Sequence, residues 1–422
     1  MNMSDRPVVL VLGAGFGGIG VISKLKKAPV DIVLVDQRNY HTFRPLLYQV
    51  ATDVLEPNTV GYPIRSFVDR QKNLSFTKAT VSGIDLENQL VNFSDWEPQH
   101  YDYLVVALGG KANFLNINGA EEHSFPLYTL NDAVKLRHHV LSKFEAASKS
   151  RELVEAGALN LVIVGGGPTG VETAGAMAEL YYNSLARDFP GLPVAQASIT
   201  LVEYGDRLLT MFDQGLSDYT KEALEERGVT VRLGESVTEI MADSVTLNSG
   251  QTLETHTTVW GAGLSAAPLA STLSDDLQHG RVPTEPMLHL TGRPEVFVIG
   301  DLAWTTDTKT EKVLPQLGSV ALQAGEHVGK TIDRMTRKHK EPEPFSYVDK
   351  GSMATIGRKA AVAALPPDIH LTGMAAALVW GSVHLALLSG AENRAVAMTN
   401  WSFAYMHHDR PSRIIIDLED ED

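Results

Sequence analysis

Two stretches of the chain share one order of apolar and polar positions. Each begins with a short apolar run, continues through a glycine cluster and a helix-like stretch, and reaches a second apolar run that ends on an acid. The first comprises "VLGAGFGGIG" at 11–20 and "DIVLVD" at 31–36, and the second comprises "LVIVGGGPTGVETAG" at 161–175 and "ITLVE" at 199–203. Apolar runs of this kind are typical of buried parallel strands. The pattern therefore predicts two strand–helix–strand units.

The glycines of the first unit have the spacing of a phosphate-binding turn. Gly13, Gly15 and Gly18 form GxGxxG, which permits a tight turn, close approach of a pyrophosphate, and packing of the helix on the strand. Asp36 ends the second strand, where a carboxylate can accept hydrogen bonds from both ribose hydroxyls. The alternative is a glycine turn in a generic α/β unit, which the order strand, helix, strand and acid disfavours.

The second unit repeats this pattern with Gly165, Gly167 and Gly170, and Glu203 stands at the ribose position. A carboxylate there would repel a 2′-phosphate, so we expect NADH to be preferred over NADPH. Arg207 lies nearby in the sequence and weakens this expectation a little.

Two phosphate-binding turns indicate two dinucleotides. If one is FAD, hydride can pass to it from NADH, whereas two nicotinamides would have no obvious chemistry between them. The strand "EVFVIGD" at 295–301 indicates that the chain returns to the first domain, where Asp301 would contact the ribityl–phosphate region of the flavin. A turn aspartate is the alternative. Glu172, expected in the first turn of its helix, is either a carboxylate stabilised by the helix N-terminus or a group that points at the nicotinamide.

Composition limits the classes of function. The 422 residues predict two or three domains. A net charge of −15 argues against nucleic acid as a partner. The absence of cysteine excludes thiolate catalysis and iron–sulfur clusters, and no spaced His, Asp or Glu cluster predicts a metal site. The N-terminal residues have no signal-peptide h-region, so a cytoplasmic protein is expected.

Several motifs resemble those of one family, the type II NADH:quinone oxidoreductases, over residues 7–416. They are "GAGFGG", "NYHTFRPLLYQVAT", "YDYLVVALG", "GGGPTGVE", "VWGAG", "VFVIGD" and "DKGSMATIGRKAAVA". The resemblance implies an α/β fold with two Rossmann-like dinucleotide-binding domains, glutathione-reductase-like, the second inserted in the first. It also implies a C-terminal helical region that associates with the membrane. We expect an FAD-binding domain at 1–127 and 284–345, an NADH-binding domain at 128–283, and the membrane-association region at 346–422.

The same resemblance implies an activity and a location. FAD would be bound non-covalently, NADH would be the donor and a membrane quinone the acceptor, and no protons would be pumped. The protein would associate peripherally with the cytoplasmic face of the cell inner membrane, and a homodimer is possible. Two other functions remain open: a soluble NADH-dependent reductase for a non-quinone acceptor, and a slow-turnover redox-sensing flavoprotein.

Individual roles also follow from the resemblance. Glu172 corresponds to the carboxylate near the flavin that acts in hydride transfer and quinone protonation, and is the candidate catalytic residue. The expected cofactor-binding residues are Gly13, Ala14, Gly15, Phe16, Gly17, Gly18, Asp36, Gln37, Val81, Gly109, Gly165, Gly167, Gly170, Glu203, Gly263, Asp301, Ser319 and Gln323. The chain departs from the family at one point, because the family usually has two glutamines four residues apart and this chain has Ser319 before Gln323. Gln316 lies three residues upstream of Ser319, and this departure leaves open an unusual quinone or a non-quinone acceptor.

The stretch "LTGMAAALVWGSVHLALLS" at 371–389 carries no formal charge. As one helix it would be roughly 28 Å long, close to the hydrocarbon thickness of a bilayer. We expect an interfacial membrane helix, with Trp380 and Trp401 as interface anchors and a second apolar helix at 395–406 beside it. A buried core or dimer helix ranks second, and a transmembrane helix ranks last.

Overall fold

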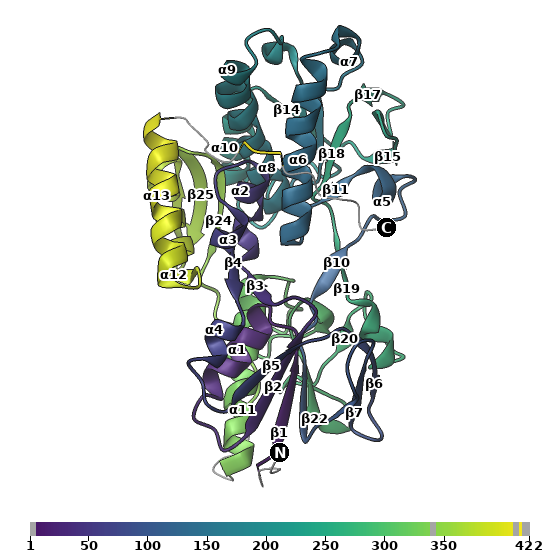
Figure 1. The fold of residues 1–422 in the computed structure, drawn as a ribbon, viewed down its shortest axis with the longest axis vertical. Helices are drawn as coiled ribbons and strands as arrows, with labels where there is room; N and C mark the ends of the chain where they lie inside the picture. Colours follow the sequence, from purple (N-terminus) through teal and green to yellow (C-terminus); the bar gives the residue numbers. More distant parts are fainter. Residues whose placement is uncertain (1–5, 338–342, 408–412, 416–422) are drawn as a thin grey trace. The chain divides into compact units, whose positions relative to one another are not determined.

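The computed structural model describes residues 6–337, 343–407 and 413–415, and the chain forms two compact units (Figure 1). Unit 1 contains residues 1–41, 62–111 and 264–348, and unit 2 contains residues 42–61, 112–263 and 349–422. Each unit holds one of the two predicted strand–helix–strand patterns. Residues 42–61 belong to unit 2, although they stand within the stretch 1–127 that the sequence suggests for the FAD-binding domain.

A six-stranded sheet forms the centre of unit 1, in the order β21-β22-β9-β1-β2-β5. The strands β22, β9, β1, β2 and β5 are parallel, and β21 is antiparallel to β22. Their bounds are β1 (Val8–Leu12), β2 (Asp31–Asp36), β5 (Leu74–Lys78), β9 (Tyr103–Val106), β21 (His289–Leu290) and β22 (Arg293–Val298).

Both faces of this sheet are covered, which explains why β1 is apolar at successive positions. Val9 and Val11 pack into a core with α1 (Phe16–Lys24) and α11 (Gly318–Arg337). Leu10 and Leu12 face the opposite core, which includes residues of a second, antiparallel sheet. That sheet consists of β6 (Val81–Asp85), β7 (Leu90–Phe93) and β8 (Gln99–His100). Figure 1 shows α1 and α11 side by side. A parallel sheet buried on both faces needs this composition.

Unit 2 contains a five-stranded parallel sheet in the order β11-β18-β12-β13-β14. Its strands are β11 (Phe125–Pro126), β12 (Leu161–Val164), β13 (Ile199–Glu203), β14 (Val229–Leu233) and β18 (Thr257–Trp260). The principal helices are α6 (Leu130–Ala147), α8 (Pro168–Glu179) and α10 (Gln214–Glu225). A π-helical segment, η2 (Leu180–Leu185), and α9 (Ala186–Asp188) continue α8. The two Rossmann-like sheets predicted from the sequence are thus confirmed.

The C-terminal part of unit 2 adds an antiparallel sheet and two helices. The sheet consists of β24 (Ser352–Gly357), β25 (Ala360–Leu365) and β26 (Ile369–Thr372), followed by α12 (Gly373–Leu387) and α13 (Ala391–His407). Figure 1 shows α12 beside β25. Gly175 of α8 lies against the main chain of Ile356 on β24, and a Cβ atom there would be 2.6 Å from the Ile356 carbonyl carbon. Only glycine permits this close approach of α8 to β24.

The prediction of one continuous helix over 371–389 is wrong. Leu371 and Thr372 lie on β26, where they pair with Ala363 and Val362 of β25, and the helix that follows has 15 residues. Within the described part of the chain, no helix has the length and apolarity needed to cross a membrane.

The remaining elements are shorter. Residues 42–61 and their flanks form β3 (Tyr40–Thr42), η1 (Arg44–Leu46), α2 (Leu47–Ala51), α3 (Pro57–Val60) and β4 (Gly61–Pro63). The others are α4 (Arg65–Val68), β10 (Gly110–Ala112), α5 (Ala120–His123), α7 (Arg151–Glu155), η3 (Val194–Gln196), β15 (Val237–Ile240), β16 (Ser244–Leu247), β17 (Thr252–Glu254), β19 (Leu264–Ala266), η4 (Pro268–Thr272), β20 (Val282–Pro283), η5 (Gly300–Leu302) and β23 (Ala303–Trp304).

Candidate functional site

The first glycine turn joins β1 to α1 and has open space at its middle position. Gly13 has a φ of +101°, and a Cβ atom there would lie 2.8 Å from the carbonyl carbon of Ala107. A Cβ atom on Gly15 would meet no atom within 4 Å. A Cβ atom on Gly18 would collide with the Gly13 carbonyl. The three glycines therefore have the three properties of a dinucleotide turn, and the main chain at Gly15 is accessible to a pyrophosphate. Phe16 and Gly17 begin α1 directly after this turn.

Asp36 lies at the end of β2 and binds the turn itself. Its Oδ2 accepts a hydrogen bond of 2.7 Å from the Ala14 N–H, and its Oδ1 accepts one of 2.8 Å from Arg38 N–H. The Ala79 N–H donates to the main-chain carbonyl of Asp36 at 3.1 Å, so the chain that leads into β6 at Val81 follows the end of β2. Asp36 thus orders the phosphate turn in addition to its predicted ribose contact, and Gln37 follows it directly.

Gly109 and Asp301 follow β9 and β22, two neighbouring strands of the same sheet. The Ala107 N–H donates to the Leu12 carbonyl at 2.8 Å, and the Ile299 N–H donates to the Val106 carbonyl at 3.1 Å. The hydrogen bonds of the sheet therefore continue past the ends of β9 and β22. The Asp301 side chain is buried, and Gln316 Nε2 donates to the Asp301 carbonyl at 2.8 Å. The predicted flavin residues Gly13, Asp36 and Asp301 therefore gather at the carboxyl edge of the unit 1 sheet, the position where open α/β sheets bind ligands.

The second glycine turn has the same geometry at the carboxyl edge of the unit 2 sheet. Gly165 has a φ of +107°, and a Cβ atom there would lie 2.9 Å from the loop that follows β18. A Cβ atom on Gly167 would meet nothing within 4 Å, and one on Gly170 would collide with the Gly165 carbonyl. Gly263, in the loop after β18, also has a positive φ, of +86°. One chain thus holds two dinucleotide turns of matching design.

Glu203 binds the second turn as Asp36 binds the first. Its Oε2 accepts a hydrogen bond of 2.5 Å from the Gly166 N–H, and its Oε1 accepts one of 2.7 Å from the Gly205 N–H. Arg207 donates instead to the Thr210 carbonyl at 3.2 Å. A carboxylate therefore stands at the ribose position of this turn.

Ser319 and Gln323 lie in the first two turns of α11 and bind the chain that follows this helix. The Ser319 hydroxyl and the Tyr347 phenol lie 2.9 Å apart. Gln323 Nε2 donates to the Val348 carbonyl at 2.9 Å, and the Val348 N–H donates to Gln323 Oε1 at 3.0 Å. The polar partner of Ser319 is therefore a phenol.

Glu172 is the fifth residue of α8, so the expectation that it lies in the first helical turn is wrong. Its side chain is only 9% exposed, and Oε1 accepts a hydrogen bond of 3.2 Å from the Thr355 N–H of β24. Burial raises the pKa of Glu172 to about 8, while the Thr355 amide and the nearby Trp380 indole act in the opposite direction. Burial therefore favours the protonated form of this carboxyl, whose hydrogen bond comes from β24 and not from the N-terminus of α8.

The sequence does not predict the cluster of residues that surrounds Glu172. Tyr48 and Gln49 of α2, Thr355 of β24 and Trp401 of α13 form a continuous series of hydrogen bonds that reaches Glu172. The motifs "NYHTFRPLLYQVAT" and "DKGSMATIGRKAAVA" contain three of them, but neither motif indicates that these residues meet. The signal in the sequence is a tyrosine and a glutamine within the otherwise apolar stretch "PLLYQVA" at 45–51.

Trp380 is not an interface anchor, because it is only 4% exposed. Its ring stacks on that of His384 at 4.0 Å between centroids, and its Nε1 has no hydrogen-bond partner of acceptable geometry among the described residues. Trp401 is partly buried and donates to Gln49. The exposed apolar side chains of α12 and α13 are others, namely Met374, Leu378, Leu387, Val396, Met398 and Phe403.

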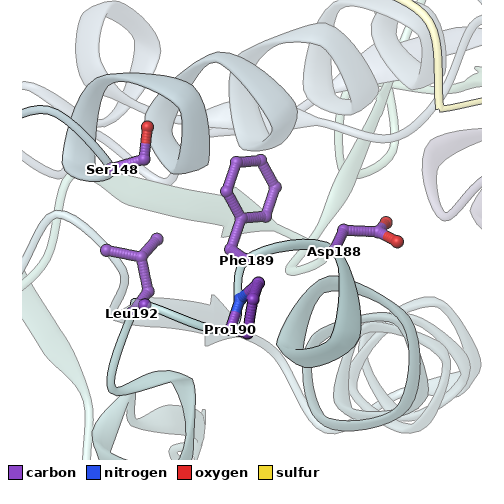
Figure 2. A pocket seen from close by; sticks show the side chains of 6 residues that line it. Ser148, Asp188, Phe189, Pro190 and Leu192 are labelled. Atoms are coloured by element: carbon purple, nitrogen blue, oxygen red, sulfur yellow. The ribbon is translucent and has the colours of Figure 1, made fainter.

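Figure 2 shows a pocket of about 270 Å³ elsewhere in unit 2. It is lined by Ser148 and by residues 188–192, where Phe189 and Leu192 face the space and Asp188 supplies a carboxylate. None of the predicted site residues lines it, so the pocket belongs to neither glycine turn.

Comparison with known proteins gives a consistent result over almost the entire chain. The family model described as pyridine nucleotide-disulphide oxidoreductase matches residues 7–325, and the NDH2 C-terminal domain matches residues 350–408. The type II NADH:quinone oxidoreductase Ndh of Mycobacterium tuberculosis is 33% identical, over 98% of this chain and 91% of its own length. The type II NADH:quinone oxidoreductase of Staphylococcus haemolyticus is 31% identical, over 84% of this chain and 88% of its own.

Among solved structures, the fold resembles that of NDH2 from Plasmodium falciparum in complex with NADH. The TM-score is 0.89 at 22% identity, with 96% of this chain and 99% of that chain covered. The C-terminal sheet and helices are included in this overlap, since it extends over nearly the whole of both chains.

Proposed function

Because this chain belongs to the type II NADH:quinone oxidoreductase family, we propose that it passes a hydride from NADH to FAD and then two electrons to a membrane quinone, without pumping protons. The observation that carries this proposal is the pair of glycine turns of matching geometry, each at the carboxyl edge of its own parallel sheet. A chain that binds two dinucleotides can join a two-electron donor to a flavin.

Unit 1 fits FAD. The open main chain at Gly15 would bind the pyrophosphate, Asp36 the ribose and Asp301 the ribityl region. FAD, when bound, supplies the redox chemistry. The chain supplies orientation, because Asp36 ties the phosphate turn to β2 and Gln316 ties the start of α11 to Asp301.

Unit 2 fits NADH. A Cβ atom on Gly167 would meet nothing within 4 Å, and Gly167 is the N-cap of α8, so a pyrophosphate would lie at the N-terminus of this helix. Glu203 stands where a ribose 2′-hydroxyl would be recognised and a 2′-phosphate repelled. This carboxylate supports NADH as the donor.

Burial favours the protonated form of the Glu172 carboxyl. A buried neutral carboxyl on the helix that follows the NADH turn is suited to orient the nicotinamide carboxamide or to give a proton to the reduced quinone. We assign it the role of catalytic acid, with the donor or acceptor side to be decided by kinetics.

The protein associates peripherally with the cytoplasmic face of the inner membrane through α12 and α13. The support is a set of exposed apolar side chains on these helices, among them Leu378 at 66% and Phe403 at 55% exposure. The alternative is that the same helices form a homodimer. Sedimentation separates the two, because a membrane-associated protein sediments with added lipid vesicles and a homodimer sediments as a dimer without them.

Stopped-flow kinetics with a soluble quinone analogue test the proposed function. Wild-type protein should show rapid flavin reduction by NADH and rapid reoxidation by quinone. Glu172→Gln should retain FAD and slow one half-reaction about ten- to a thousandfold, whereas the exposed Glu222→Gln on α10 should leave both rates unchanged. Wild-type protein that turns over slowly with every quinone would be a redox sensor, and wild-type rates in Glu172→Gln would remove Glu172 from the catalytic role.

A further inference from the structure

A series of four hydrogen bonds connects the C-terminal helix α13 to Glu172. The Trp401 Nε1–H donates to Gln49 Oε1 at 2.7 Å, and Gln49 Nε2 donates to the Tyr48 hydroxyl at 2.9 Å. The Tyr48 hydroxyl lies 3.0 Å from Thr355 Oγ1, and the Thr355 N–H donates to Glu172 at 3.2 Å. The five residues come from α13, α2, β24 and α8, and none of these elements is adjacent to the next along the sequence. Thr355 takes part with its hydroxyl toward Tyr48 and with its main-chain N–H toward Glu172.

The indole at the start of this series fixes its direction. An indole N–H can only donate, so the amide oxygen of Gln49 faces Trp401 and its NH₂ group faces Tyr48. The Tyr48 oxygen then accepts from Gln49, and its own proton is available for Thr355 Oγ1. Replacing Trp401 by a residue without an N–H would leave the Gln49 amide free to rotate. The directions of the Gln49–Tyr48 and Tyr48–Thr355 hydrogen bonds would then no longer be fixed, whereas the main-chain N–H of Thr355 can only donate.

The segment that carries Tyr48 and Gln49 is held firmly on two other sides. Asp53, just after α2, is fully buried and lies 3.6 Å from Nε of the buried Arg137 on α6. Asn393, near the start of α13, donates to the Thr59 carbonyl of α3 at 2.9 Å. Since α13 contacts residues 42–61 at two points, at Asn393 and at Trp401, it can determine where α2 places its polar side chains.

We infer that Trp401 and Gln49 are positioning residues for Glu172, because acting through Tyr48 they hold the Thr355 N–H on the Glu172 carboxyl. This inference rests on the proposed function and deepens it, since it states how the C-terminal helix reaches the catalytic acid. Three residues, Gln49, Tyr48 and Thr355, stand between Trp401 and Glu172 in the series, so the effect of Trp401 on Glu172 is indirect.

The titratable groups on the elements around the series are Tyr48 of α2, His384 of α12 and Glu179 of α8. Burial raises the pKa of Tyr48 well above its ordinary value, and burial lowers the pKa of His384 on α12 to about 4. Glu179 of α8 is paired with Arg358, at 3.0 Å from its Nε. The Thr355 N–H favours the ionised form of Glu172, so its displacement should make Glu172 harder to ionise.

The test is an infrared titration of the FAD-loaded, full-length protein. The C=O stretch of protonated Glu172 is assigned as the band that Glu172→Gln removes, and its midpoint is measured against pH. Trp401→Phe and Tyr48→Phe should each raise this midpoint by about one pH unit, the size expected for loss of one hydrogen bond to a charged group. The double variant should shift no further than Tyr48→Phe alone, since both changes act on one series of bonds.

Trp260→Phe is the matched control. It also removes a buried indole N–H, which donates to the Asn113 carbonyl at 3.0 Å, but it should leave the Glu172 midpoint unchanged. An unchanged midpoint in Trp401→Phe, or shifts that add in the double variant, would overturn the inference. If Tyr48→Phe does not fold, Gln49→Met replaces it, both as the single variant and in the double variant with Trp401→Phe. The infrared band measures the protonation of Glu172 and not its part in turnover. The inference and the proposed function can therefore fail independently of each other.

Discussion

The buried carboxyl of Glu172 should make the stability of the protein depend on pH in a defined window. Its pKa is raised from an ordinary value of 4.5 to about 8 by burial. Between these values the folded protein keeps the proton and the unfolded chain has released it. A group with a raised folded-state pKa stabilises fully below the unfolded value, and this contribution is lost as the pH rises toward the folded value. Stability should therefore fall from pH 4.5 to 8 through this one group.

The size of the effect follows from the number of protons involved. Between pH 5.5 and 7.5 the folded state binds about one more proton at Glu172 than the unfolded state. Each pH unit then corresponds to about 1.36 kcal/mol, so the free energy of unfolding should fall by about 2 to 3 kcal/mol relative to a variant that cannot ionise there. Glu172→Gln is that variant, because the amide has the shape of the acid and no charge.

Urea unfolding of both proteins at pH 5.5, 6.5 and 7.5, with FAD bound, measures this difference. As the pH rises, the free energy of unfolding of the wild type should fall relative to that of Glu172→Gln. Other titrating groups affect both proteins equally and cancel in the difference. Parallel curves for the two proteins would show that Glu172 ionises at its ordinary pKa, and the reasoning from burial would be refuted.

Three further predictions concern the cofactors and the membrane. The purified protein should be yellow and release FAD on denaturation, and Gly15→Val, which fills the open space in the first turn, should lose the flavin; release of FMN would contradict the dinucleotide assignment. NADH should exceed NADPH in kcat/KM by on the order of a hundredfold or more, because Glu203 would face the 2′-phosphate; equal use of the two donors, compared with the Arg207→Ala control, would show that Arg207 dominates. Leu378→Ser combined with Phe403→Ser should release the protein from lipid vesicles in a flotation assay, with FAD content and turnover on a soluble quinone analogue retained; unchanged binding would place the membrane contact elsewhere.

The sequence predicted well what is encoded locally. A glycine turn, its flanking strands and the acid that follows lie within about 40 residues of one another, so GxGxxG and the apolar runs suffice to locate Gly13, Asp36, Gly165 and Glu203. The apolar runs also predicted parallel sheets correctly, because a strand covered on both faces has no polar positions.

What the sequence did not predict depends on contacts between distant residues. The partner of Glu172 is Thr355, 183 positions away. Residues 42–61 pack with unit 2 because α2 meets α6 and α8, which no local pattern indicates. Leu371 was assigned to a helix because a short apolar run has no period that separates strand from helix. The burial of Trp380 depends on distant segments, because its ring lies against Tyr48 of α2 and Trp401 of α13.

The division of each unit into three chain segments has a consequence for synthesis on the ribosome. The unit 1 sheet lacks a strand until β22 has emerged, because Leu104 of β9 is aligned with Val296 of that strand. Unit 2 lacks the partners of Tyr48 and Gln49 for longer still, since these lie 307 and 352 positions further on. Neither unit can therefore reach its native state cotranslationally before most of the message has been read. We expect slow folding with high contact order and a nascent chain that exposes its sheets to chaperones. A ribosome that stops a few codons before Trp401 would release a polypeptide that contains both glycine turns but lacks the indole at the start of the hydrogen-bond series that reaches Glu172.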